Sequence, residues 1–224
     1  MTAVLLSQLG FYGARIVQRH LAVGPGGNIS VRDGDDMLIS PSGFALDEVG
    51  EKDWVRVDIH TGRVADPAGR PSSEVSMHRS IYRTRHDVNA IVHTHPPVTI
   101  AVISSGYPEI PFMFPDQVAL TGRTPSIPYV IPCSEELARA VVHALGRDAS
   151  VLLLQNHGLI TIGATLKQAY YRTEIVEDAA RVFWMAKTIG EPRTLTDGEA
   201  DAILGLEAEK YRQALLAQGT EREQ

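Results

Sequence analysis

The stretch Ile91-Val92-His93-Thr94-His95-Pro96-Pro97 places two histidines at the end of an apolar run. An apolar run of this kind predicts a buried strand, here from Ala90 to His95. Side chains two residues apart on a strand lie on one face, so His93 and His95 should point the same way. We therefore expect a strand inside a sheet that presents both imidazoles to one metal ion at its end.

Two other segments supply further candidate metal ligands. His157 follows the apolar run 151–154 and precedes Gly158, so it also lies at the end of a predicted strand. Glu74, in Ser72-Ser73-Glu74, adds a carboxylate. Three neutral imidazoles and one carboxylate suit zinc or a similar divalent ion. Alone, each piece has a plainer interpretation: a His-x-His pair is only moderately specific, and an acid such as Glu74 suits the start of a helix.

Three small polar pairs lie at predicted loop ends: Gly27-Asn28, Ser42-Gly43 and Ser72-Ser73. Each offers hydroxyl, amide or backbone N–H donors, and such donors at the start of a helix form an anion site. The alternative is that they are ordinary turn and capping residues. The stretch Gly24-Pro25-Gly26-Gly27 lacks the following helix that a dinucleotide-binding turn needs. The three pairs are therefore candidates for binding an anionic group of a substrate.

The composition of the chain is that of a globular protein. Its 224 residues suit one domain, 1–224, and 44% of them are hydrophobic and 21% charged. The formal net charge of −6 gives no reason to expect nucleic-acid binding. Cys133 is the only cysteine, which excludes an intrachain disulfide and cysteine-rich zinc modules. The sequence shows neither a bilayer-spanning apolar stretch nor a signal-peptide pattern, so we expect a cytoplasmic enzyme.

Hydrophobic periodicity and turn residues divide the chain into helices and strands. Ser72 or Ser73 should cap a helix on which His78 and Tyr82 lie one turn apart and should pack together. The segment 107–132 looks irregular, and the chain should fray from residue 218 to residue 224. We expect strands at 28–32, 37–40, 54–58, 90–95, 150–155 and 158–162 and near 127–130, and helices at 4–20, 73–85, 98–103, 135–144, 166–189 and 197–217.

Five motifs occur in order along the chain: Gly27-Asn28-Ile29-Ser30-Val31-Arg32, Ile39-Ser40-Pro41-Ser42-Gly43, Ser72-Ser73-Glu74, His93-Thr94-His95 and Asn156-His157-Gly158. In this order they resemble the class II aldolase/adducin family, most closely its fuculose-phosphate aldolase branch. The resemblance runs from the first helix to about Ile189. It implies an α/β fold with three layers, α/β/α, around a mainly antiparallel central sheet. It also implies a homotetramer with active sites between neighbouring subunits.

The resemblance also implies roles for the candidate residues. It implies one divalent metal per subunit, zinc first and manganese, cobalt or iron as alternatives, bound by Glu74, His93, His95 and His157. It further implies that Glu74 acts as a base once it leaves the metal. The implied binding site for a substrate phosphate comprises Gly27, Asn28, Ser42, Gly43, Ser72 and Ser73.

The chain departs from the aldolase pattern in the segment after the histidine strand. The fuculose-phosphate branch has a catalytic tyrosine there that reaches a neighbouring subunit, whereas this chain has Phe112 or Phe114 at the matching position. Phenylalanine cannot donate a proton. Asp116 lies nearby and is a candidate acid/base, or else a turn residue after proline. A second family tyrosine matches Tyr211, whose alternative interpretation is an ordinary residue on a helix face.

Together these features predict a metal-dependent lyase that cleaves a phosphorylated ketose into dihydroxyacetone phosphate and an aldehyde. The ketose would be of the fuculose-, deoxyribulose- or methylthioribulose-phosphate type, and the apolar run Phe112–Pro115 favours the last two. Alternatives within the family are a dehydratase that uses Asp116, a decarboxylase, and an epimerase, which would carry Asp in place of Glu74. The alternative without catalysis is an adducin-like interaction module. We expect no nucleic-acid or membrane partner.

Overall fold

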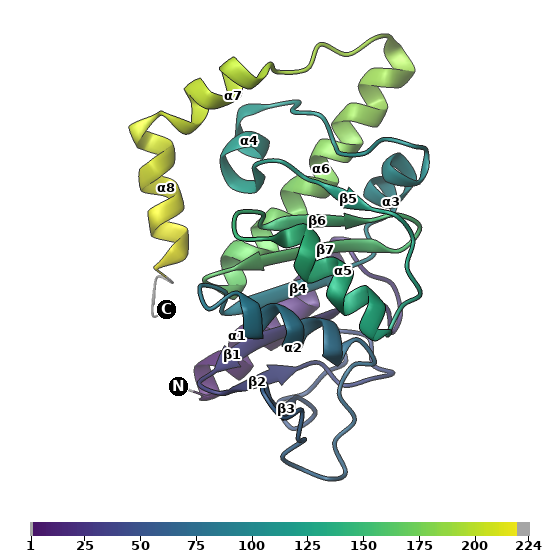
Figure 1. Cartoon of the computed structure of the whole chain (residues 1–224), viewed down its shortest axis with the longest axis vertical. Helices are drawn as coiled ribbons and strands as arrows, with labels where there is room; N and C mark the ends of the chain where they lie inside the picture. The colour runs from purple at the N-terminus through teal and green to yellow at the C-terminus, as the bar shows by residue number, and fades with distance from the viewer. Residues whose placement is uncertain (1, 219–224) are drawn as a thin grey trace.

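A seven-stranded sheet forms the centre of the computed structural model, which describes residues 2–218 (Figure 1). The strands are β1 (Asn28–Asp33), β2 (Asp36–Ile39), β3 (Val55–Asp58), β4 (Ala90–Thr94), β5 (Ser126–Ile127), β6 (Val151–Leu154) and β7 (Gly158–Gly163). Their spatial order is β3-β2-β1-β4-β7-β6-β5, and the neighbours pair antiparallel except for β5 with β6. The strand that carries His93 is therefore the middle strand of the sheet.

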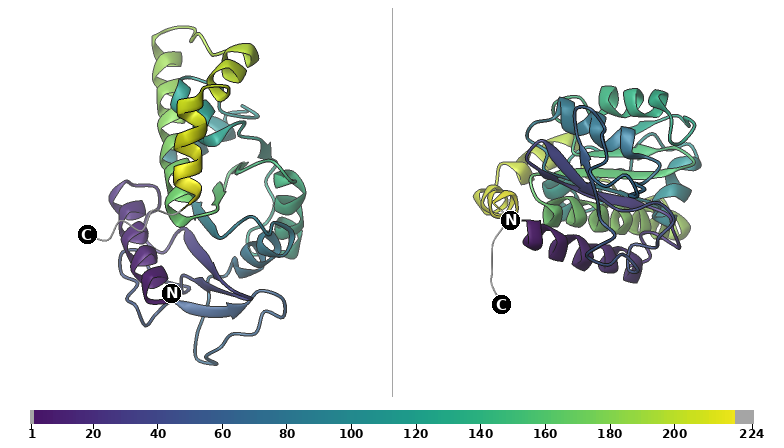
Figure 2. Two further views of the ribbon diagram at one scale, coloured as in Figure 1. Left: turned by 90° about the vertical axis from the view of Figure 1, so that its left-hand side faces the viewer. Right: turned by 90° about the horizontal axis from the view of Figure 1, so that it is seen from below.

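Helices cover both faces of the sheet, so the molecule has three layers (Figure 2). Within residues 2–218 they are α1 (Thr2–Gln18), α2 (Val75–Thr84), α3 (Pro97–Ser104), α4 (Pro115–Thr121), α5 (Glu135–Leu145), α6 (Leu166–Ile189), α7 (Asp197–Leu204) and α8 (Glu207–Ala217). Residues of α2 and α5 pack on one face, and residues of α1, α3 and α6 pack on the other. This arrangement confirms the predicted three-layer α/β/α fold with a mainly antiparallel sheet.

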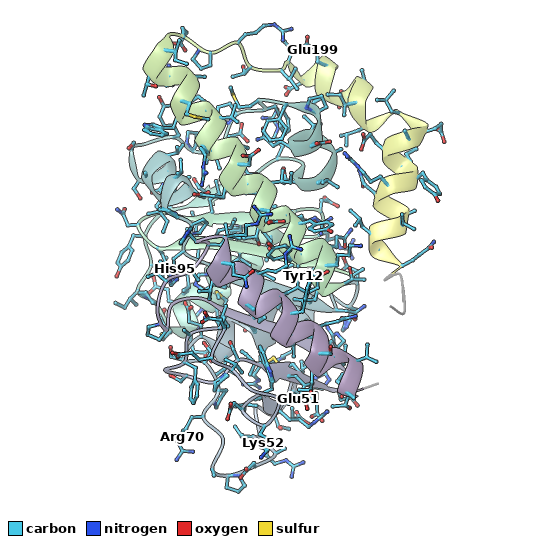
Figure 3. The ribbon with its side chains drawn as sticks, turned by 180° about the vertical axis from the view of Figure 1, so that it is seen from behind. Tyr12, Glu51, Lys52, Arg70, His95 and Glu199 are labelled. Atoms are coloured by element: carbon cyan, nitrogen blue, oxygen red, sulfur yellow. The ribbon has the colours of Figure 1, made fainter. Side chains whose placement is uncertain are left out.

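The alternation of side chains along the strands explains why apolar side chains pack on both faces of the sheet. Along β6, Leu152 and Leu154 face α2 and α5, whereas Val151 and Leu153 face α3 and α6. Successive side chains of a strand point to opposite faces, and both faces of this strand are covered, which is why it is apolar throughout. Seen from behind, α1 lies beside α6, and the ring of Tyr12 packs against Tyr170 at a centroid distance of 5.0 Å (Figure 3).

The prediction for α6 is confirmed at both ends. The helix spans Leu166–Ile189, and the Thr165 hydroxyl accepts the N–H of Gln168 at its start. Gly190 follows the last turn. A side-chain cap at one end and a glycine at the other are strong helix boundary signals. Among residues 2–218, no helix combines the length and the apolar character that crossing a bilayer would need.

Three local predictions are wrong. The segment 107–132 contains helix α4, which begins with Pro115, a residue that suits the first turn because it lacks an N–H. The predicted last helix is two helices, since the chain turns at Gly205. Neither Ser72 nor Ser73 is the N-cap of α2: that residue is Glu74, whose side chain makes no capping hydrogen bond, while the Ser72 hydroxyl accepts the backbone N–H of Glu74 at 3.3 Å. The predicted fraying lies outside the described residues, apart from residue 218.

Candidate metal centre

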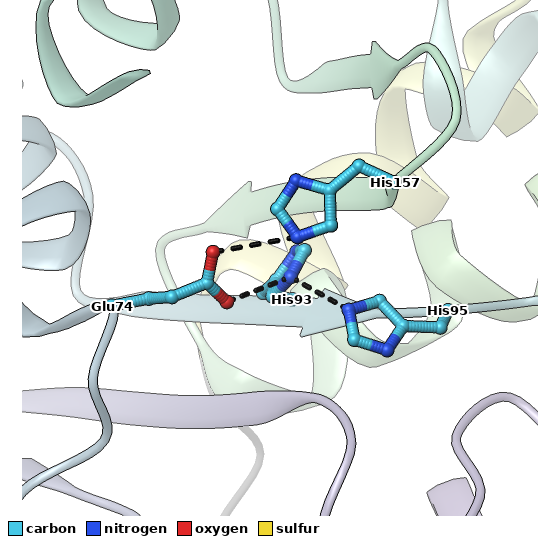
Figure 4. A group of neighbouring side chains, drawn as sticks. All are labelled: Glu74, His93, His95 and His157. Carbon is cyan, nitrogen blue, oxygen red and sulfur yellow. Dashed lines mark hydrogen bonds and ion pairs between the residues drawn. The ribbon is translucent and has the colours of Figure 1, made fainter. Parts of the chain in front are cut away.

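Four side chains from three separate segments converge at the carboxyl end of β4 (Figure 4). His93 lies on β4, His95 follows it directly, His157 lies in the turn between β6 and β7, and Glu74 precedes α2. The Nε2 atom of His93 lies 3.0 Å from Oε2 of Glu74 and 3.1 Å from Nε2 of His95. The Nε2 atom of His157 lies 3.4 Å from Oε1 of Glu74. One potential ligand atom from each of the four residues lies within 4.8 Å of the others.

The backbone around His157 has little freedom. Asn156 adopts the left-handed conformation with φ +56°, which turns the chain back from β6 into β7. A Cβ atom on Gly158 would collide with the backbone oxygen of Thr94 and would lie 2.8 Å from the His95 ring. A glycine is therefore required beside His157, because any larger residue would push the turn away from the end of β4.

The protonation of the imidazoles fits a metal site. Nδ1 of His93 lies 3.0 Å from the backbone oxygen of Leu159, which can only accept, so Nδ1 carries a hydrogen and Nε2 is the nitrogen that faces the cluster. Burial lowers the pKa of His95 and of His157 to about 4, so both rings are neutral near neutral pH. Burial opposes ionisation of Glu74, but the adjacent imidazoles and the Asn28 amide outweigh it and hold the pKa of this carboxyl well below its usual range.

In the part of the chain that the structure describes, no lysine or arginine pairs with Glu74, the one carboxylate of this donor set. When the three imidazoles offer lone pairs instead of hydrogens, these lone pairs and the carboxylate repel each other at these distances unless a cation lies between them. Among the described residues, Oε1 of Glu74 is buried and has no hydrogen-bond donor. Three nitrogens and one carboxylate oxygen fit zinc and similar ions of the first transition series. The four residues therefore form a group that can hold a divalent metal ion.

A cavity of about 300 Å³ opens onto this cluster. It is lined by Glu74, His95 and His157, together with all six residues predicted to bind a phosphate: Gly27, Asn28, Ser42, Gly43, Ser72 and Ser73. The loop at 41–43 and the loop at 70–73 are joined by backbone hydrogen bonds, from Ser42 to Arg70 and from Ser72 to Ser40. Gly27 and Gly43 both have positive φ angles, +75° and +85°. The structure thus brings the metal candidates and the anion candidates to one cavity.

Residues 8–184 match the family described as Class II Aldolase and Adducin N-terminal domain. The chain belongs to the class II aldolase/adducin family. The predicted resemblance is thereby confirmed.

Similar proteins include enzymes named for ketose 1-phosphates. The 5-deoxy-D-ribulose 1-phosphate aldolase of Bacillus thuringiensis is 34% identical over 197 residues, which cover 86% of this chain and 90% of that protein. The 5-methylthioribulose-1-phosphate/5-deoxyribulose-1-phosphate aldolase of Rhodospirillum rubrum is 35% identical over 208 residues, covering 86% and 91%. A solved structure of L-fuculose 1-phosphate aldolase superimposes with a TM-score of 0.83 at 31% identity, covering 93% of this chain and 96% of that one.

The other residues predicted to take part in catalysis lie away from the cavity of their own chain. Asp116 is exposed in the first turn of α4 and forms an ion pair of 2.8 Å with Arg212 of α8. Tyr211, next to that arginine, is 70% exposed. The ring of Phe112 lies beneath the guanidinium of Arg123, and Phe114 packs against the core beside α6. Asp116 and Tyr211 thus belong to the α4 and α8 region rather than to the metal cluster.

Some residues at the site were not predicted from the sequence. Cys133 lines the cavity and has φ +62°, and the sequence offers no local signal for that position. Glu177 of α6 is buried, and its carboxylate accepts the backbone N–H groups of Val98 and Thr99 and the hydroxyl of Thr99. It thereby holds the first turn of α3, which begins two residues after His95. Nearly 80 residues separate these partners in the chain, so no short-range pattern could reveal the contact.

Proposed function

We propose that this protein is a divalent-metal-dependent aldolase that cleaves a ketose 1-phosphate into dihydroxyacetone phosphate and an aldehyde. The observation that carries the proposal is the shared cavity, which unites the Glu74/His93/His95/His157 cluster with six small polar residues suited to a phosphate. In a metal-dependent aldolase of a ketose phosphate, the ion stabilises the charge that develops during cleavage and the phosphate site positions the substrate. The aldolase names of the similar proteins support the same reaction.

The proposed substrate is a 5-deoxy- or 5-methylthio-pentulose 1-phosphate. Two of the similar enzymes are named for such ketoses. In the family pattern the segment Phe112–Pro115 of a neighbouring subunit would contact the aldehyde part of the substrate, and this segment is apolar here. An apolar wall favours a methyl or methylthio group over a hydroxylated carbon, because burying a hydroxyl without a partner costs free energy.

In the proposed mechanism, the loops at 27–28, 42–43 and 72–73 bind the phosphate and so fix the position of the ketone. A bound divalent ion, zinc in the first instance, would supply a Lewis acid for the negative charge that develops during cleavage. The bond between the third and fourth carbons of the ketose breaks, the proton of the fourth-carbon hydroxyl is removed, and the electron pair stays with the phosphate half. Glu74, once it has taken up a proton from solvent, delivers it to the third carbon, which completes dihydroxyacetone phosphate, while the proton taken from the fourth-carbon hydroxyl returns to solvent.

We propose Asp116 or Tyr211 as the group that removes the hydroxyl proton, contributed by a neighbouring subunit of a homotetramer. The exposure of both residues and their common place at α4 and α8 support this proposal. We further propose that residues 1–224 form one domain and that the enzyme is cytoplasmic.

The test is to incubate the purified protein with the 1-phosphates of fuculose, 5-deoxyribulose and methylthioribulose, and to identify the products. Dihydroxyacetone phosphate supports the proposal, whereas loss of water from the ketose identifies a dehydratase. A chelator should abolish the activity, and added zinc or manganese should restore it. Full activity after complete removal of metal would refute the proposal.

A further inference from the structure

A buried path of hydrogen bonds leads from Tyr82 to Glu74. Ser30 Oγ lies 2.9 Å from the Tyr82 hydroxyl and 2.7 Å from Nδ1 of His78. Nε2 of His78 lies 2.6 Å from Oδ1 of Asn28, and Nδ2 of Asn28 lies 3.0 Å from Oε2 of Glu74. His78, Ser30 and Tyr82 have no exposed surface at all. These buried polar side chains therefore form their hydrogen bonds with one another and not with solvent.

The path arises from two regular spacings. Asn28 and Ser30 are two residues apart on β1, so they share one face of the strand. Glu74, His78 and Tyr82 are four residues apart at the start of and along α2, so they share one face of the helix. Where the strand face meets the helix face, the polar groups alternate between the two elements.

The direction of every hydrogen bond follows from the carboxylate. Ionised Glu74 can only accept, so the Asn28 amide must turn its NH2 group towards Glu74 and its oxygen towards His78. Nε2 of His78 must then carry the hydrogen. Burial lowers the pKa of His78 to about 3, so the ring is neutral and Nδ1 accepts the Ser30 hydroxyl. Ser30 in turn accepts from Tyr82, and all four donors point towards Glu74.

The path does not carry protons to or from solvent. Tyr82 ends it, and the guanidinium of Arg32 covers the Tyr82 ring at 4.8 Å while donating to the backbone oxygen of the same residue. Burial raises the pKa of the Tyr82 phenol well above its usual range, so the hydroxyl stays a donor. A closed path of this kind orients groups and has no outlet for a proton.

We infer that His78 is a positioning residue for Asn28 and Glu74. Its Nε2 hydrogen fixes the orientation of the Asn28 amide, which holds Oε2 of Glu74 and leaves Oε1 free for a metal ion. Without that hydrogen the amide can rotate by half a turn and place its oxygen against the carboxylate. The part of the inference that concerns phosphate binding by Asn28 rests on the proposed function, whereas the part that concerns the metal does not.

The first experiment compares divalent-ion affinities of purified variants by competition with a chromophoric chelator, using zinc as the probe. His78→Leu removes the donor at similar size and should weaken zinc binding about 10- to 100-fold, as outer contacts of metal ligands commonly do. His78→Gln places an N–H near the former Nε2 position and should restore most of the affinity. Tyr82→Phe removes only the hydroxyl at the far end of the path, so it should weaken zinc binding less than His78→Leu does.

The matched control is Thr173→Val. Thr173 is also fully buried and shares a hydrogen bond of 2.7 Å with Thr161, on the α6 side of the sheet. This variant should lose stability in thermal unfolding as a buried hydroxyl contact is broken, yet it should keep the zinc affinity. The inference is overturned if His78→Leu binds zinc as the unaltered protein does, or if Thr173→Val weakens zinc binding equally.

The second experiment needs no substitution and decides the matter even if His78→Leu fails to fold. Neutron diffraction from crystals of the zinc-loaded protein should show a hydrogen on Nε2 of His78 and none on Nδ1. A hydrogen on Nδ1 instead would overturn the inference. Both experiments are independent of catalysis: if no ketose 1-phosphate is cleaved, the proposed function fails, while the zinc affinities and the tautomer still test the role of His78.

Discussion

The two parts of the proposed active site are built in opposite ways. The metal cluster lies at the end of the middle strand of the sheet, and its Glu74 and His93 side chains are buried. Asp116 and Tyr211 lie on α4 and α8 with their side chains exposed to solvent. One chain is therefore enough to assemble the metal cluster, whereas the proposed proton-transfer groups would reach a cavity only in a neighbouring subunit. Perturbing each part should have distinct consequences.

The largest effect should come from His93→Ala. The imidazole is fully buried and is the ring that contacts both Glu74 and His95. Its loss should release the metal and with it several kcal/mol of stabilisation during cleavage, so turnover should fall about 10³-fold or more. Metal content by mass spectrometry and the rate of dihydroxyacetone phosphate release measure the two effects.

The control for this variant is His60→Ala, which removes an exposed imidazole from the turn after β3, where it lies beside Asp35 and not in the cluster. It should keep both metal and turnover. If His93→Ala retained one metal ion per subunit and full activity, the cluster would not be the metal site.

The next largest effect should come from Asp116→Asn. If this carboxylate removes the hydroxyl proton, turnover should fall about 10²-fold or more, the usual contribution of a general acid or base. The folding stability should change by less than about 1 kcal/mol, because the broken contact is an exposed ion pair with Arg212. Steady-state kinetics and chemical denaturation separate the two outcomes.

Asp197→Asn provides the matched control, since Asp197 is also exposed in the first turn of a helix and also pairs with an arginine, Arg123. Equal turnover in the Asp116 and Asp197 variants would remove Asp116 from the mechanism. Tyr211→Phe should then be measured as the remaining candidate.

A smaller effect is expected from Gly158→Ala, which adds one methyl group between His157 and the end of β4. The new Cβ would strike the backbone of Thr94 and the His95 ring, and forcing such a group into a packed site costs about 1–3 kcal/mol. Both the free energy of unfolding and the zinc affinity should fall. Gly198→Ala is the control, because no atom lies within 4 Å of a Cβ added there. An unchanged unfolding free energy for Gly158→Ala would contradict the close approach.

These contrasts also explain which features could be predicted from the sequence. The strand around His93 and the boundaries of α6 follow from local spacing, since apolar runs mark the strands and Thr165 and Gly190 mark the ends of the helix. The three-layer fold was implied by the family resemblance of the ordered motifs. The clustering of Glu74 with the histidines was predicted from ordered motifs. In each case the signal lies within a few neighbouring residues or a familiar order of motifs.

Contacts between distant segments could not be predicted in the same way. Glu177 reaches Val98 across the fold, and Ser30 meets His78, which lies 48 positions further along the chain, so no spacing rule pairs them. The four-residue spacing of Glu74, His78 and Tyr82 was visible, but it fitted simple packing equally well. Only the placement of β1 against α2 shows that these side chains meet Asn28 and Ser30.

The mildest perturbation is acid, which should destabilise the metal-free protein gradually. In the unfolded chain the imidazoles titrate near their usual value of about 6.5, whereas burial lowers the pKa of His95 and His157 to about 4 in the folded protein. As pH falls from about 7 towards 4, the unfolded chain therefore binds protons that the folded protein does not, and stability falls. The depressed pKa of Glu74 acts in the same direction, since its contribution is present above the unfolded value of about 4.3 and is lost below it.

Thermal unfolding midpoints of the metal-free protein between pH 7 and pH 5 measure this trend. His157→Gln removes one of the two histidines with a lowered pKa, so its midpoint should depend less steeply on pH than that of the unaltered chain. Substituting the exposed His60 by Gln should leave the slope unchanged, because no buried imidazole is removed. Equal slopes for all three proteins would mean that the histidines of the cluster are not held neutral by burial, and the contrast between a buried metal cluster and an exposed proton-transfer region would lose its electrostatic basis.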